Sequence, residues 1–139
     1  VRASELRGID VPPELVPLAI DEFPVLFVAA ACASGTTVVT GAEELRVKES
    51  DRIASMADGL RALGVDAEPR PDGLRIVGGS LSGGTIDSRG DHRIAMAFAV
   101  AALRASAPLR ILDVANVATS FPGFPELAAT HGLHVEVVR

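Results

Sequence analysis

The densest group of charged side chains lies in segment 43–52, at the expected start of a helix. Arg46, Lys48 and Arg52 place three cations in this segment, and Glu49 adds a carboxylate beside them. Free backbone N–H groups and the helix dipole favour an anion at such a position. Arginine binds phosphate or carboxylate through paired hydrogen bonds, lysine supplies a point charge, and a carboxylate can transfer a proton. The segment predicts an anion site; the competing interpretation is a solvated charged loop with a capped helix.

Further polar groups occur where two apolar segments begin. Asp91 and Arg93 open one segment, and Asp21 opens the other, 70 residues before Asp91. Each aspartate could simply cap a helix, and His92 is by itself more often structural than functional. If the two segments pack side by side, these groups meet those of segment 43–52 at one edge. The candidate site residues are then Asp21, Lys48, Glu49, Arg52 and Arg93.

An internal repeat supplies the elements that must position these groups. The apolar segments 24–33 and 94–103 begin 70 residues apart, and similar patterns follow each of them. In each copy we expect a helix, a strand, a second helix and closing strands, the last over 74–77 and 135–138. Both first helices are apolar nearly all round, so we expect them to be buried on all sides, with the sheets outside.

In the first copy, individual residues predict where the second helix begins and ends and where a turn lies. The apolar residues of segment 50–63 share one helical face, with Ser50 as the expected N-cap and Gly64 as the stop. The sequence Arg-Pro-Asp-Gly at 70–73 predicts a turn between two short strands. The pattern indicates an α/β fold. We divide it into the end of a preceding unit (1–20), a first repeat unit (21–89) and a second (90–139).

The composition excludes several classes of protein. The 139 residues are 48% hydrophobic and 22% charged, as in a globular chain with a core. A net charge of −5, with five Phe and no Trp or Tyr, argues against a nucleic-acid partner. No apolar run reaches the roughly 18 residues of a membrane span, and no signal peptide is visible. The single cysteine, Cys32, has apolar neighbours and is expected to be a small buried residue in a reducing cytoplasm.

Four motifs make the chain similar to a known family. Segment 46–56, Arg-Val-Lys-Glu-Ser-Asp-Arg-Ile-Ala-Ser-Met, resembles a signature of the EPSP synthase (3-phosphoshikimate 1-carboxyvinyltransferase) family. Segments 20–24, 91–96 and 118–122 resemble three further motifs in the same order and spacing, so the resemblance spans essentially the whole chain. Within that pattern Thr119 stands where many members have lysine.

The resemblance implies a function, a fold and a location. The family transfers the enolpyruvyl group of phosphoenolpyruvate to the 5-hydroxyl of shikimate 3-phosphate and releases phosphate, in the cytoplasm, without a metal or other cofactor. Its fold has two domains, each of three βαβαββ units with buried parallel helices and outer sheets, around an active-site cleft. The chain opens without an initiator methionine, and we expect a C-terminal fragment with two of the three units of one domain. Without the N-terminal domain we expect it to be inactive.

The resemblance also assigns roles to the candidate residues. Asp21 matches the aspartate that orients or deprotonates the attacking hydroxyl. Glu49 matches the glutamate that transfers a proton to the phosphoenolpyruvate methylene, and Lys48 matches a lysine near shikimate 3-phosphate. Arg52 and Arg93 match the arginines that hold phosphoenolpyruvate.

Two rival interpretations remain open at this point. The enolpyruvyl transferase that acts on UDP-N-acetylglucosamine shares the fold, although the run of charged residues at 46–52 argues against it. A non-catalytic anion-binding or assembly module is the second rival, because an absent unit would expose an apolar helix face that allows self-association.

Overall fold

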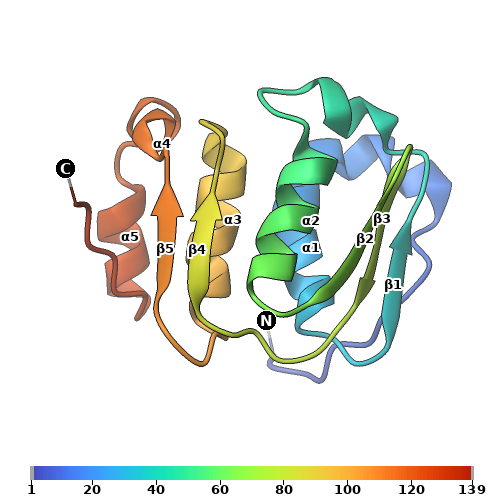
Figure 1. Cartoon of the computed structure of the whole chain (residues 1–139), viewed down its shortest axis with the longest axis horizontal. Coiled ribbons are helices and arrows are strands. Elements are labelled where there is room, and N and C mark those ends of the chain that lie inside the picture. The colour runs from blue at the N-terminus through green and yellow to red at the C-terminus, as the bar shows by residue number, and fades with distance from the viewer. Residues whose placement is uncertain (1, 139) are drawn as a thin grey trace.

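The computed structural model describes residues 2–138 and arranges them as an α/β fold, as the sequence predicts (Figure 1). Helices α1 and α2 lie against a three-stranded sheet, and α3 lies against a pair of strands. The elements in chain order are η1 (Pro13–Leu15), η2 (Pro17–Glu22), α1 (Phe23–Ala31), β1 (Thr36–Val39), η3 (Glu43–Val47), α2 (Arg52–Ala62), β2 (Asp66–Arg70), β3 (Gly73–Val77), β4 (Gly84–Asp87), α3 (His92–Ala101), β5 (Leu109–Leu112), α4 (Ala115–Ser120) and α5 (Phe124–Thr130).

The three-stranded sheet is antiparallel and has the order β1-β3-β2. Arg70 pairs with Gly73, so the predicted turn is a hairpin whose loop is Pro71 and Asp72. Alternate residues of the strands face the helices, and Ile76 in the central strand is fully buried. The sheet therefore contributes one apolar face to the core.

The second sheet is a parallel pair, in which β4 and β5 are joined through α3. The same connection occurs earlier in the chain, where the segment that contains Arg7 and Asp10 runs parallel to the start of β1 and is joined to it through α1. In both places a helix crosses over between parallel segments, which is the βαβ geometry.

Helix α2 begins and ends at well-defined residues. Its N-cap is Asp51, whose Oδ1 accepts a hydrogen bond from the Ala54 N–H at 3.0 Å. The predicted cap, Ser50, lies one residue before the observed cap. Its hydroxyl does not cap α2 but donates to the carboxylate of Asp91. The helix stops at Gly64 as predicted, with a positive φ of 83° and a hydrogen bond from Val65 N–H to Leu60 C=O.

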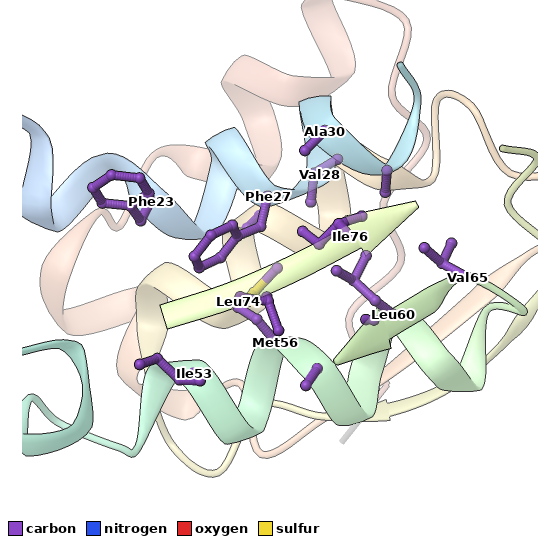
Figure 2. Close-up of a cluster of buried hydrophobic side chains, with 14 of the residues drawn as sticks. Phe23, Phe27, Val28, Ala30, Ile53, Met56, Leu60, Val65, Leu74 and Ile76 are labelled. Atoms are coloured by element: carbon purple, nitrogen blue, oxygen red, sulfur yellow. The ribbon is translucent and has the colours of Figure 1, made fainter. Parts of the chain in front are cut away.

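The core joins α1, α2 and β3. Figure 2 shows Phe27 from α1, Met56 from α2 and Ile76 from β3 in one cluster, and all three are fully buried. Helix α2 also approaches α3 closely. A Cβ on Gly59 would lie 2.3 Å from the ring of Phe98, so a larger residue there would have to push that ring aside.

The first helices of the two copies are not buried on all sides, contrary to the sequence prediction. Val25 and Leu26 of α1 are 39% and 45% exposed, and Val100 of α3 is 37% exposed. Most other apolar residues of both helices pack inward. Leu26 borders a hollow beside α1, and Val100 borders a hollow between α3 and α5.

The end of the second copy also differs from the prediction. Segment 135–138 is not a strand, although its β-branched sequence favours one. A strand needs a neighbour to pair with, and the segment follows α5 without one among the described residues. Cys32 is half-buried against the core, and burial raises the pKa of its thiol. Among residues 2–138 the structure has no helix long and apolar enough to cross a membrane.

Candidate active site

The candidate residues gather where the helices begin. Helices α2 and α3 both start at the upper end of the view in Figure 1, and η2 brings Asp21 to the same end. The helices begin at the same end because each of them follows an extended segment that runs toward that end. Ion pairs and hydrogen bonds connect all the candidates: Asp21, Lys48, Glu49, Arg52 and Arg93.

Arg52 is the centre of this network, and its side chain is only 1% exposed. Every nitrogen of its guanidinium donates to a carboxylate. Nε lies 2.9 Å from Asp91 Oδ2, Nη1 lies 3.0 Å from Asp21 Oδ1, and Nη2 lies 2.5 Å from Glu49 Oε2. Burial lowers the pKa of Arg52, but the hydrogen bonds and charges of Asp91, Glu49 and Asp21 together outweigh it and raise the pKa, so the guanidinium stays charged.

Asp91 is the completely buried partner of Arg52. Its Oδ2 accepts from Arg52 Nε and from the Ser50 hydroxyl at 3.0 Å, while its Oδ1 caps α3 by accepting from the Arg93 N–H at 3.0 Å. Burial raises the pKa of Asp91, but the hydrogen bonds and charge of Arg52, together with the bonds from Arg93 N–H and Ser50, outweigh it and hold the pKa below its ordinary value. The carboxylate is therefore ionised at neutral pH.

Asp21 lies on the open side of the network and is 45% exposed. Besides the bond from Arg52, its carboxylate lies 3.5 Å from Lys48 Nζ and 4.0 Å from Arg93 Nη2. Desolvation raises the pKa of Asp21, but the charges of Lys48 and Arg93, together with hydrogen bonds from Lys48 and Arg52, outweigh it and lower the pKa. Asp21 is not a helix cap, since the N-cap of α1 is Glu22 and makes no side-chain capping bond.

Arg93 and Lys48 hold the two flanks of the same open side. Arg93 Nη1 donates to the Asp21 carbonyl at 2.9 Å and lies 3.5 Å from Glu22 Oε1. Lys48 Nζ lies 2.5 Å from Glu44 Oε1, and this hydrogen bond is the main cause that raises the pKa of Lys48. The Lys48 ammonium is therefore charged at neutral pH.

The arrangement can hold an anionic ligand and move protons beside it. Glu49, like Asp21, is about half-exposed (53%), whereas Asp91 is sealed in the interior. The exposed carboxylates can leave Arg52 when an anion takes their place. Cations that are fixed in advance stabilise negative charge without reorganising, and a carboxylate at the same site can act as acid or base.

Arg46 is the charged residue whose expected role differs in the structure. Its guanidinium donates to the Arg70 carbonyl and, at 2.7 Å, to the Pro71 carbonyl, and it pairs with Asp51 at 2.7 Å. Arg46 therefore fastens the β2–β3 hairpin to the start of α2 and does not face the network around Arg52.

Sequence reasoning grouped Asp91 with the residues expected to meet at one edge but gave it no role beyond a helix cap, so it missed the pairing of Asp91 with Arg52. Capping residues are visible from local sequence, but the pairing of Asp91 with Arg52 joins residues 39 positions apart and has no local signal. His92 is the first residue of α3 and is half-buried. Within residues 2–138, no group of three or more His, Cys, Asp or Glu side chains is arranged to hold a metal ion.

Comparison with known proteins places the chain among enolpyruvyl transferases. Over 137 residues it is 69% identical to the 3-phosphoshikimate 1-carboxyvinyltransferase of Methylococcus capsulatus, covering 99% of this chain and 31% of that protein. The protein of the same name from Acidithiobacillus ferrooxidans is also 69% identical, with 99% and 32% covered. The chain thus spans about a third of the length of these relatives.

Solved structures agree with the sequence relatives. The EPSP synthase from Acinetobacter baumannii, determined at 2.37 Å, superposes with a TM-score of 0.94 at 56% identity, over 97% of this chain and 32% of that chain. The model of the family EPSP synthase (3-phosphoshikimate 1-carboxyvinyltransferase) matches residues 1–127. Because this match extends over most of the chain, the protein belongs to the EPSP synthase family.

Proposed function

We propose that this chain forms part of an enzyme that transfers the enolpyruvyl group of phosphoenolpyruvate to the 5-hydroxyl of shikimate 3-phosphate and releases phosphate. The observation that carries the proposal is the convergence of two half-exposed carboxylates on the buried Arg52, with Lys48 and Arg93 beside them. Phosphoenolpyruvate carries a carboxylate and a phosphate, and such a cationic edge is chemically complementary to it.

The positions of the residues support separate roles. Arg52 and Arg93 approach from two different helices and would bind phosphoenolpyruvate between them. Lys48, on the flank next to Asp21, would contact shikimate 3-phosphate. Asp21 would orient the attacking hydroxyl, and Glu49 would face the methylene carbon of phosphoenolpyruvate.

The proposed reaction is balanced in two steps. In the first step, a proton passes from Glu49 to the methylene carbon while the 5-hydroxyl oxygen bonds to the neighbouring carbon and loses its proton to Asp21. The tetrahedral intermediate carries a carboxylate and two phosphates, which the arginines and Lys48 stabilise. In the second step, the C–O bond to phosphate breaks, the new methyl group returns a proton to Glu49 as the enol ether double bond forms, and Asp21 passes its proton to the departing phosphate.

The proposal also assigns the units of the fold. Residues 21–89 and 90–139 form two βαβαββ-type repeat units, and residues 1–20 end a preceding unit. The crossovers through α1 and α3 support two equivalent units, because each joins two parallel segments in the same way. Each crossover also uses a segment just ahead of the assigned boundary, residues 7–10 for the first unit and β4 for the second. The site is completed by a second domain that belongs to the remaining two thirds of a relative's length. The enzyme works in the cytoplasm and uses no metal or cofactor.

The apolar surface supports association with more chain. Two shallow hollows of about 300 Å³ each are lined mostly by apolar side chains, one beside α1 and one between α3 and α5. In the complete enzyme we propose that further chain covers these faces. When the 139-residue chain is alone, they drive self-association. A sizing column run at several concentrations tests this, and a monomer at all of them contradicts it.

The activity is tested by exchange into a complete enzyme. This chain replaces the corresponding 31% of the Methylococcus capsulatus relative, and phosphate release from phosphoenolpyruvate and shikimate 3-phosphate is followed in a coupled assay. We expect turnover by the chimera and none by the chain alone. A folded chimera without phosphate release contradicts the proposed activity, and release by the chain alone at the chimera's rate contradicts the shared site.

Site variants of the chimera test the assigned residues. Arg93→Ala removes a proposed phosphoenolpyruvate ligand, and we expect about a hundredfold loss of kcat/KM, typical of a lost charge-assisted contact. Arg75→Ala is the matched control, because Arg75 also pairs with carboxylates, at 3.3 and 3.8 Å, but on the outer face of the sheet. Equal activities of the two variants would contradict the proposed role of Arg93 in binding phosphoenolpyruvate.

A further inference from the structure

We propose that Asp91 is the positioning residue of the site and fixes both arginines in place for phosphoenolpyruvate, an inference that rests on the function proposed above. A single carboxylate reaches both arginines: Oδ2 accepts from the side chain of Arg52, and Oδ1 accepts from the backbone of Arg93. Asp91 itself would not touch the substrate, because it is completely buried.

The first step is the division of Arg52 into a held edge and an open edge. Asp91 takes the Nε side of the guanidinium, at 2.9 Å from Nε and 3.5 Å from Nη2. The exposed carboxylates of Asp21 and Glu49 take the remaining Nη donors. The planar guanidinium cannot rotate about its long axis while Asp91 holds the Nε side, so the open edge points in one direction.

The second step concerns exchange of partners. A carboxylate that is half-exposed can return to water at low cost, whereas a buried carboxylate cannot leave its cation without a large desolvation penalty. An incoming anion therefore replaces Asp21 and Glu49 on Arg52, and Asp91 stays. The exchange has a chemical consequence, because it releases the two carboxylates proposed for proton transfer when the substrate arrives.

The third step links the two helices. The side chain of Asp91 starts α3, which carries Arg93, and the same side chain holds the first residue of α2. The Ser50 hydroxyl donates to Oδ2 as well, so both carboxylate oxygens of Asp91 accept hydrogen bonds from the site. The distance between Arg52 and Arg93 therefore depends on one buried group, which is the geometry that a rigid bidentate substrate requires.

The test compares Asp91→Asn with Asp51→Asn in the full-length chimera. Both aspartates are N-caps that also pair with an arginine, but Asp51 pairs with Arg46, outside the network. Asparagine keeps the cap and removes the charge in each case. For Asp91→Asn we expect the Kd and KM for phosphoenolpyruvate to rise about tenfold or more, as when a supporting partner of a ligand is lost. We expect the KM for shikimate 3-phosphate to stay within about twofold, since its lysine is not held by Asp91.

A coupling measurement adds a readout that a purely structural role would not move. If Asp91 acts through Arg52, then Asp91→Asn costs less affinity for phosphoenolpyruvate in an Arg52→Lys background than in the parent, because lysine has no Nε edge to hold. Independent, multiplicative losses overturn the proposal. So does an Asp91→Asn enzyme with the parent's Kd and KM.

A measurement on the parent enzyme decides the proposal even if Asp91→Asn does not fold. The Arg52 Nε–H resonance should stay protected from solvent exchange when phosphoenolpyruvate is added, because Asp91 remains bonded to it. Loss of protection overturns the proposal. A parent that binds phosphoenolpyruvate but releases no phosphate contradicts only the proposed function, and a parent that does not bind it overturns both.

Discussion

Arg52 and Asp91 lie 39 residues apart in the chain, yet Arg52 Nε donates to Asp91 Oδ2 at 2.9 Å and neither side chain is more than 1% exposed. Arg52 is the first residue of α2 and Asp91 is the N-cap of α3. The ion pair therefore connects the starts of two helices that carry the proposed ligands of phosphoenolpyruvate. Its burial makes the network sensitive to changes in charge, in pH and in helix packing.

The first prediction concerns this buried pair. Arg52→Met should reduce the free energy of unfolding by about 3–5 kcal/mol, because it leaves the Asp91 charge buried beside an apolar side chain. The double variant Arg52→Met/Asp91→Asn removes both charges and should lose less than Arg52→Met alone. Urea unfolding at pH 7 measures the free energies of the parent, of Arg52→Met, of Asp91→Asn and of the double variant, and a double loss equal to the sum of the two single losses would contradict the prediction.

The second prediction is a loss of stability in acid. The pKa of Asp91 lies below its ordinary value of 3.8, mainly because Arg52 outweighs the effect of burial. The unfolded chain then takes up a proton more readily than the folded chain, so this stability is complete above pH 3.8 and disappears as the pH falls through the lowered pKa. Urea unfolding from pH 7 to pH 2 should show the fall.

The comparison variant for the acid effect is Asp91→Asn, whose unfolding free energy should depend less on pH below the ordinary aspartate pKa. Asp21 also has a lowered pKa, but its half-exposed side chain is screened by water and should contribute less. Parallel pH profiles for the parent and Asp91→Asn would show that the acid loss has another origin.

The third prediction separates Arg46 from the site. Arg46→Met should lower the free energy of unfolding by about 2 kcal/mol, because the carbonyls of the hairpin and Asp51 lose a charged donor. The KM for phosphoenolpyruvate in the chimera should be unchanged. Arg75→Met is the control, since its exposed ion pairs on the outer face should contribute less than about 1 kcal/mol. A large rise in KM for Arg46→Met would show that Arg46 contributes to the anion site and would contradict the prediction.

The fourth prediction concerns the close approach of α2 and α3. Gly59→Ala places a methyl group against the buried ring of Phe98 and should cost about 1–3 kcal/mol through overpacking. It should also weaken phosphoenolpyruvate binding, because the same two helices carry Arg52 and Asp91. Thermal unfolding and a binding titration measure the two effects.

A matched glycine provides the control for Gly59→Ala. A Cβ on Gly79 meets no atom within 4 Å and its φ is not positive, so Gly79→Ala should leave stability and binding nearly unchanged. Replacing Phe98 by leucine should recover part of the loss in Gly59→Ala. No recovery would mean that the damage comes from the helix backbone of α2 and not from the contact with α3.

Much of the local structure was predictable because its causes are local. The apolar face of α2, its stop at Gly64 and the hairpin at Pro71 and Asp72 depend on residues within one or two turns of the chain. The cap of α2 was misplaced by one residue, at Ser50, since two adjacent residues can both cap and only the contact with Asp91 distinguishes them.

The motif residues and their chemical types were also apparent from the sequence, and they sufficed to indicate the family and an anion site at helix starts. Only the tertiary structure decided which cations serve that site. Arg46 and Arg52 have the same side chain six positions apart, but packing turns Arg46 to the hairpin and buries Arg52 among three carboxylates. The physical reason is that an ion pair depends on where distant segments meet, and the contact of α2 with α3 at Gly59 and Phe98 sets that position.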